Sequence, residues 1–167
     1  MVYDASGCAW VTEKSKVNMA ADNLYDDVMM DHIKNARNYR VISDAHRKAA
    51  AVNRLCGDEI TVYLKIYRER IDDVAFQCLS CGISMASASI MTEAVKGRSC
   101  AEARDWSQAV RALIDESSWS MASRFHPDLT VVLAALSAFP ARKTCAALAW
   151  HALTSALDIR QETISLG

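Results

Sequence analysis

The stretch ITVYLKIY, residues 60–67, decides the fold class, because its strongly apolar side chains occupy every second position. Alternation with a period of two predicts a β-strand with one buried face, and β-branched residues and tyrosine favour such a surface. The charged segment 68–70 predicts a turn, after which residues 71–78 return as a second strand. The short apolar segment 49–55 predicts a third strand that leads into this hairpin. The middle of the chain therefore predicts a small three-stranded antiparallel sheet.

Segments with helical spacing flank these strands on both sides. Their apolar residues recur at steps of three and four, the spacing of a helix with one buried face. The predicted helices are residues 22–35, residues 84–96, a stretch beginning at Ser99, a stretch from about Pro127 to Pro140, and residues 142–157. This order of elements predicts an α+β fold in which helices cover the small sheet. We expect one domain over residues 21–160, preceded by a flexible leader over residues 1–20.

Several predicted helix ends carry local signals. Gly97 follows the second helix and suits the left-handed conformation that ends many helices. Ser99 and Glu102 have the spacing of a capping box, which predicts the start of the next helix. Pro127 is typical of the first turn of a helix, and Pro140 predicts the end of that helix.

The composition is that of a globular chain. The 167 residues include 19 Lys and Arg and 20 Asp and Glu, a formal net charge of -1, and 51% of them are hydrophobic. This balance offers no basic excess for nucleic acid, and no apolar run approaches the ~20 residues that span a bilayer. The first residues do not resemble a secretory signal. We therefore expect a cytoplasmic protein whose thiols stay reduced.

The cysteines are the most distinctive residues. They are Cys8, Cys56, Cys78, Cys81, Cys100 and Cys145. Cys81 lies just before one predicted helix and Cys145 in the first turn of another, where the helix dipole and free N–H groups stabilise a thiolate. We therefore expect both to be thiolates at neutral pH. Cys56 and Asp58 flank Gly57 in a tight turn, which adds a carboxylate oxygen to the sulfurs. This mixed set suits tetrahedral zinc or an iron–sulfur cluster.

Other residues with metal-binding side chains have simpler interpretations. Cys8 and Cys100 are expected to act as small apolar residues, because a single cysteine is more often a buried hydrophobe than a ligand. His32 lies on a half-buried helix, and we interpret it as a structural histidine that is hydrogen-bonded within the fold.

Four blocks of sequence resemble the U-type iron–sulfur scaffold proteins, the family of IscU, SufU and the N-terminal domain of NifU. The blocks are LYDDVMMDHIKNARN (24–38), CGD (56–58), CGISMASASIMTEAVKG (81–97) and FPARKTCAALAW (139–150). They follow the family's order, and the resemblance extends over residues 22–158. The sequence is most similar to the SufU type, because Thr144 precedes Cys145 and the segment between Cys81 and Cys145 is long.

The resemblance implies a SufE/NifU-like fold and a role in iron–sulfur cluster assembly. It implies the ligands Cys56, Asp58, Cys81 and Cys145, with Arg142 close by, around Zn2+ or a transient [2Fe–2S] cluster. A pyridoxal-phosphate cysteine desulfurase is the implied sulfur donor, the three cysteines are candidate acceptors, and apo iron–sulfur proteins are the implied recipients. A close alternative is a zinc-bound sulfurtransferase that activates a desulfurase and builds no cluster.

The sequence departs from the family at two places near the cysteines. Arg54 replaces a proline before the CGD block, and the family's G-x-G-C is here CLSC, residues 78–81. The resulting C-x-x-C pair leaves Cys78 three interpretations: a rival to Asp58 as fourth ligand, a redox partner of Cys81, or an inert thiol facing the core. It also leaves open another class of function, a C-x-x-C thiol redox or structural zinc module without sulfur trafficking.

Overall fold

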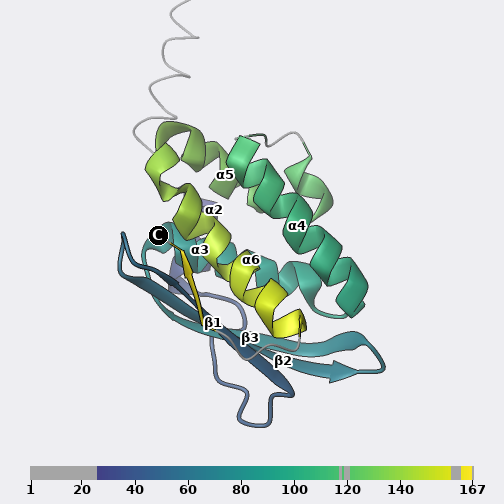
Figure 1. The fold of residues 1–167 in the computed structure, drawn as a ribbon. Coiled ribbons are helices and arrows are strands. Elements are labelled where there is room, and N and C mark those ends of the chain that lie inside the picture. The colour runs from purple at the N-terminus through teal and green to yellow at the C-terminus, as the bar shows by residue number, and fades with distance from the viewer. Residues whose placement is uncertain (1–25, 117, 119–120, 159–162, 167) are drawn as a thin grey trace, which may run out of the picture.

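Figure 1 shows the computed structural model of the protein, which describes residues 26–116, 118, 121–158 and 163–166. The predicted leader, Cys8 and the first residues of the first predicted helix lie outside this part. The elements in chain order are α2 (Asp27–Lys34), β1 (Arg47–Asn53), β2 (Asp58–Tyr67), β3 (Arg70–Leu79), α3 (Gly82–Val95), α4 (Cys100–Glu116), α5 (Leu129–Ala138), α6 (Lys143–Leu157) and β4 (Thr163–Leu166). Within the described ranges, no helix has the length and apolarity that crossing a membrane requires.

The strands form one sheet in the order β3-β2-β1-β4. β1 and β3 both run antiparallel to β2, as the sequence predicts, with Ala51 opposite Ile60 and Val62 opposite Phe76. β4 adds a fourth strand parallel to β1, which the sequence pattern does not predict. Its four residues are too few to show a period, and they lie beyond residue 160, where the predicted domain ends.

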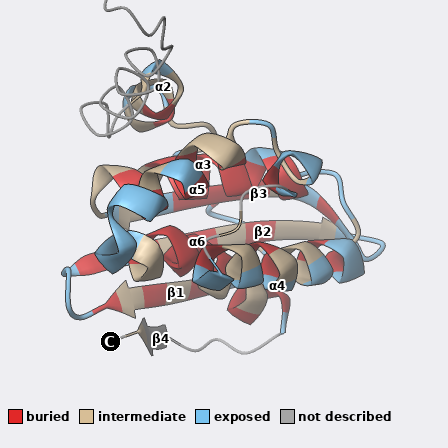
Figure 2. Cartoon of the chain, turned by 90° about the horizontal axis from the view of Figure 1, so that it is seen from above, coloured by how far each residue is buried: buried red, intermediate tan, exposed pale blue. Residues whose placement is uncertain are grey.

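The antiparallel strands are buried on one face. In β2 the side chains of Ile60, Val62 and Leu64 are fully buried, whereas the residues between them are partly exposed. α3 and α6 cover this face, α4 packs on α6, and α2 and α5 pack on α3 (Figure 1). Figure 2 shows the buried residues along the strands and along α3 and α6. The α+β class, with helices covering a three-stranded antiparallel sheet, is thus confirmed.

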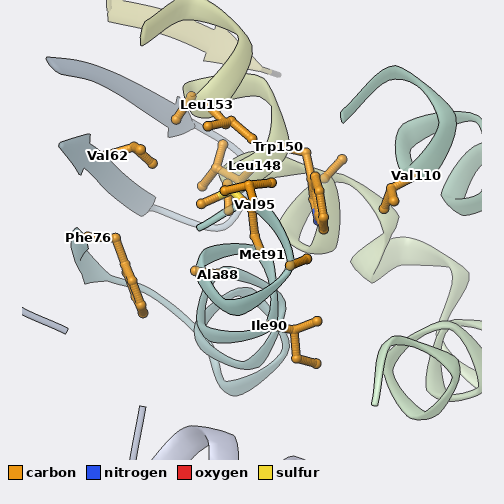
Figure 3. Packing of buried hydrophobic residues seen from close by; sticks show 14 of the residues in the cluster. Val62, Phe76, Ala88, Ile90, Met91, Val95, Val110, Leu148, Trp150 and Leu153 are labelled. Carbon is orange, nitrogen blue, oxygen red and sulfur yellow. The ribbon is translucent and has the colours of Figure 1, made fainter. Parts of the chain in front are cut away.

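A buried serine joins the two helices that cover the sheet. Ser87 Oγ of α3 donates to the carbonyl of Ala146 in α6 at 2.7 Å and accepts from Nε1 of Trp150 at 3.2 Å. Trp150 is fully buried in the same hydrophobic cluster as Met91 of α3 (Figure 3). Ser107 of α4 donates to the Trp150 carbonyl at 2.8 Å. These hydrogen bonds fix the position of α6 relative to α3 and α4.

The capping signals place the ends of α3 and α4 as predicted. Gly97 has a φ of 80° and follows Lys96, the C-cap of α3. The Glu102 N–H donates to Ser99 Oγ at 3.1 Å, and the Glu102 carboxylate accepts from the Ser99 N–H at 2.9 Å. The predicted capping box is therefore confirmed.

The start of α5 differs from the prediction and involves His32. The helix begins at Leu129 after the N-cap Asp128, so Pro127 precedes the helix instead of lying in its first turn. The Asp128 carboxylate makes no cap hydrogen bond, because it lies 3.0 Å from Nε2 of His32, whose Nδ1 lies 2.8 Å from Ser89 Oγ of α3. His32 is 1% exposed. Its two ring nitrogens link α2 to Ser89 of α3 and to Asp128, the N-cap of α5, which confirms its structural role.

Two serines of α3 provide a matched pair of substitutions. Ser84 and Ser87 are both fully buried, but Ser84 Oγ has no hydrogen-bond partner among the described residues. We predict that Ser87→Ala lowers the free energy of unfolding by about 1–3 kcal/mol, because it leaves the buried Trp150 N–H unpaired. Ser84→Ala should leave this free energy nearly unchanged. Urea denaturation measures both values, and equal losses in the two variants would contradict the hydrogen-bond account.

Candidate metal-binding site

The turn between β1 and β2 presents Cys56 to solvent. The backbone carbonyl of Asn53 accepts a hydrogen bond from the Gly57 N–H at 2.9 Å. The side-chain Oδ1 of Asn53 accepts one from the Leu55 N–H at 3.1 Å. Gly57 has a φ of 71°, a backbone conformation that is strained for residues with a side chain, so glycine is favoured at this position. Cys56 is exposed on this turn, and Asp58, the first residue of β2, is only 4% exposed.

Two helix N-termini meet at the same place. Cys81 is the N-cap of α3, and Cys145 is the third residue of α6, as the sequence predicts. The Cys81 N–H donates to Asp58 Oδ1 at 3.1 Å, which ties the start of β2 to the start of α3. Helix N-termini carry partial positive charge and attract anions, so both helices favour anionic ligands at this point.

Three of the four ligands that the resemblance implies converge. One ligand atom from each of Asp58, Cys81 and Cys145 lies within 4.8 Å of the other two, a grouping found once in the described part of the chain. Cys56 does not belong to this group but adjoins it, because its Sγ lies 3.4 Å from the Sγ of Cys145. The structure therefore offers a candidate metal site of two sulfurs and one carboxylate, with a further thiol at its exposed edge.

The Asp58 carboxylate is suited to a cation. Its Oδ2 is buried and has no hydrogen-bond partner among the described residues. A buried, unpaired carboxylate oxygen is unfavourable unless a ligand satisfies it. Sulfur, carboxylate and tetrahedral geometry are typical of zinc, and thiolates also hold iron–sulfur clusters. The residues present therefore fit a metal ion or a small cluster.

The expectation that Cys145 is a thiolate at neutral pH is wrong for the protein alone. Burial raises the pKa of Cys145 above its usual range, and its neighbours Cys56 and Cys81 raise it further. Its helix position does not overcome this, because the side chain is 0% exposed and adjoins other sulfurs. A bound cation would lower the pKa of Cys145, since a thiol that coordinates a metal ion gives up its proton.

Arg142 lies beside the thiols, as the resemblance implies. Its guanidinium interacts with the Cys145 sulfur, and Cys81 and Cys56 lie close to it. Arg142 is exposed in the turn before α6. It therefore places a positive charge at the solvent side of the sulfur group.

Asn53 belongs to the site but received no role from sequence reasoning. It is 1% exposed, and its Nδ2 donates to the Cys145 sulfur at 3.6 Å. A polar residue before a glycine turn is ordinarily found in solvent, so its burial could not be recognised from the pattern. Asn53 connects the turn that carries Cys56 to the buried Cys145.

Cys78 and Cys100 lie outside the converging group. The Cys78 Sγ lies 3.6 Å from Sδ of Met85 and accepts from Ser80 Oγ at 3.1 Å, and burial raises the pKa of the Cys78 thiol. These contacts favour the interpretation of Cys78 as an inert thiol packed against the core. Cys100 is 4% exposed within the hydrophobic core, as expected for a small apolar residue.

The chain belongs to the family of the NifU-like N terminal domain, whose profile matches residues 24–146. It is 37% identical over 138 residues to a protein of Bacillus subtilis named zinc-dependent sulfurtransferase SufU, covering 81% of this chain and 90% of that one. It is 34% identical to the iron-sulfur cluster assembly scaffold protein IscU of Streptococcus pyogenes, covering 86% of both chains.

A similar fold is found among solved structures. The crystal structure of a putative iron-sulfur cluster assembly scaffold protein for the SUF system, from Fervidobacterium islandicum, superposes with a TM-score of 0.72 at 28% sequence identity. The match covers 80% of this chain and 96% of that one. Sequence and fold thus agree on the family that the cysteine blocks resemble.

We predict that zinc affinity rises with pH. Because burial keeps the pKa of Cys145 above its usual range, Zn2+ must displace the thiol proton when it binds. Each proton released raises the affinity about tenfold per pH unit. Competition with a chromophoric chelator on either side of neutral pH measures this slope. Cys100→Ser should keep the slope and Cys145→Ala should reduce it, whereas a pH-independent affinity would contradict the site.

Proposed function

We propose that this protein is an iron–sulfur cluster assembly scaffold that accepts sulfur from a cysteine desulfurase. The observation that supports this most strongly is the convergence of Asp58, Cys81 and Cys145 within 4.8 Å, with the exposed Cys56 at their edge. One thiol is thus open to another protein, and three ligand atoms lie behind it. A scaffold needs both features, because sulfur must arrive from outside and be held inside.

The exposed thiol is the proposed point of sulfur entry. The Cys56 thiolate attacks the outer sulfur of the donor's cysteine persulfide, and the donor cysteine leaves as a thiolate, so the sulfane sulfur changes carrier. Arg142 is exposed beside the thiols. Its guanidinium stabilises the negative charge that develops on sulfur during this transfer.

Asp58 gives the proposed site its lability. A carboxylate oxygen is a harder ligand than a thiolate and a poorer match for iron–sulfide. Cys56, Asp58, Cys81 and Cys145 are the proposed ligands, and a bound zinc ion would supply Lewis-acid stabilisation of the thiolates. Iron and sulfide are cargo in this proposal, to be released to apo iron–sulfur proteins.

The proposed partners follow from this chemistry. The sulfur donor is a pyridoxal-phosphate cysteine desulfurase, whose persulfide must come into contact with the turn 54–57. The proposed location is the cytoplasm, because the reaction needs free thiols and these persist in a reducing compartment.

A zinc-bound sulfurtransferase is the second candidate, favoured by the pair of sulfurs with one carboxylate. In that case Cys56, Asp58, Cys81 and Cys145 would hold the zinc ion, and the exposed Cys56 would pass sulfur onward without cluster assembly. A C-x-x-C redox module has less support, because the Cys78 sulfur faces Met85 and does not join the converging group.

Anaerobic reconstitution with iron, cysteine and a cysteine desulfurase tests the proposal. A labile visible chromophore that passes to apo-ferredoxin is the result expected for a scaffold. Tightly held zinc, no chromophore and faster desulfurase turnover would overturn it in favour of the sulfurtransferase. Metal analysis before and after the reaction distinguishes the two.

We predict that Asp58→Ala slows release of the cluster or metal, because the remaining sulfur ligands hold iron more firmly than a mixed set does. Transfer to apo-ferredoxin, followed by absorbance, measures the rate. Asp72→Ala is the matched control, since Asp72 is an exposed carboxylate of β3 that lies outside the converging group. Unchanged transfer in Asp58→Ala would rule out the role of Asp58 in lability.

A further inference from the structure

Cys56 and Cys145 differ in exposure although their sulfur atoms are neighbours. Cys56 is exposed on the turn 54–57, whereas Cys145 is 0% exposed. Sulfur passes between cysteines by direct attack of one sulfur on another, so an acceptor must be accessible to its donor. In this conformation Cys56 can meet the cysteine of another protein and Cys145 cannot.

The two sulfurs are close enough to react with each other. The Cys145 thiol donates a hydrogen bond to the Cys56 Sγ at 3.4 Å. We propose that Cys56 and Cys145 form an intramolecular sulfur relay, in which Cys145 takes over the sulfane sulfur that arrives at Cys56. This inference rests on the proposed function in one step, the loading of Cys56 by a desulfurase.

The relay conserves atoms and electrons. The Cys145 sulfur attacks the outer sulfur of the Cys56 persulfide, so a bond from Cys145 Sγ to that sulfur forms while the bond from Cys56 Sγ breaks. The electron pair of the broken bond stays on Cys56 Sγ, which takes the proton that Cys145 gives up. The products are a Cys145 persulfide and a Cys56 thiol, and no oxidant or reductant is consumed.

On the entry side Cys56 faces solvent, where an added sulfur meets no packed side chains. A sulfur–sulfur bond is about 2.05 Å long, so Cys56 must move outward when it carries a persulfide. All four residues of the turn 54–57 are exposed, so this movement carries Cys56 toward solvent and away from the core. Cys145 is held in place, because it lies in α6 and accepts a hydrogen bond from the buried Asn53 at 3.6 Å.

The direction of the relay follows from burial and ligand geometry. Sulfur on Cys56 is open to solvent thiols, which remove a persulfide by exchange. The Cys145 Sγ is buried and lies within 4.8 Å of ligand atoms from Asp58 and Cys81. The relay thus moves sulfur from the exposed turn to the place where a metal ion is proposed to bind.

Mass-spectrometric mapping of persulfides over time tests the relay in the chelator-treated protein. A brief pulse of glutathione persulfide loads accessible thiols, and alkylation at successive times traps the carriers. The expected result is early label on Cys56 that declines as label on Cys145 rises. Label that reaches Cys145 without first appearing on Cys56, or that never leaves Cys56, would overturn the relay.

Variants make the test independent of the time course. Cys56→Ser should abolish labelling of Cys145, and Cys145→Ala should leave the label on Cys56. Cys100→Ser, which removes a buried thiol outside the site, should behave as the unaltered protein. Undiminished labelling of Cys145 in Cys56→Ser would contradict the relay. Near-ultraviolet circular dichroism checks that each variant keeps its packed core.

A second donor separates the relay from the proposed function. If a cysteine desulfurase with cysteine loads no cysteine of this protein while glutathione persulfide still drives transfer from Cys56 to Cys145, the proposed function fails and the relay stands. If both donors load Cys56 but Cys145 stays unlabelled, the sulfur-acceptor function stands and the relay fails.

Discussion

The contact between α3 and α6 is the constraint on which the site depends. Cys81 and Cys145 are far apart in the chain, and each is fixed at the start of one of these helices. Ser87 joins the helices by donating to the Ala146 carbonyl and accepting from the Trp150 indole. Because α3 and α6 start at the same end of the core, their N-termini bring two sulfurs and two positive helix ends to one point.

The sheet supplies the other half of the site through the turn between β1 and β2. Asn53 pairs with Asp58 across the turn, so the end of β1 and the start of β2 are held in register. Asp58 then uses one carboxylate oxygen to fix Cys81 and keeps the other buried and unpaired. An unpaired buried group costs about 1–3 kcal/mol. A cation bound at this site would offset the loss.

The sequence predicts most of the fold for physical reasons that can be named. Alternation in residues 60–67 identifies β2, and the Ser99 capping box identifies the start of α4. The sequence does not predict β4, because four residues are too few to show an alternation of apolar and polar side chains. Pro127 predicts the start of α5 too early, because the Asp128 carboxylate contacts His32. Errors of this kind arise where a tertiary contact overrides a local preference.

The site was predicted less completely than the fold. The family blocks point to Cys56, Asp58, Cys81 and Cys145, but residue spacing alone does not separate the exposed thiol from the three converging side chains. The state of Cys145 was also wrong, because helix position suggests a thiolate while burial raises the pKa of the thiol. The burial of Cys145 and of Asn53 depends on the packing of α6 against β1. No local sequence pattern encodes this packing.

X-ray absorption at the zinc edge tests the central claim most directly. We expect a mixed coordination shell of the bound zinc, with sulfur at about 2.3 Å and the Asp58 carboxylate oxygen at a shorter distance. Asp58→Ala should remove the oxygen contribution, and Cys78→Ser should leave the spectrum unchanged. A shell of four sulfurs that requires Cys78 would contradict the site described by Asp58, Cys81 and Cys145.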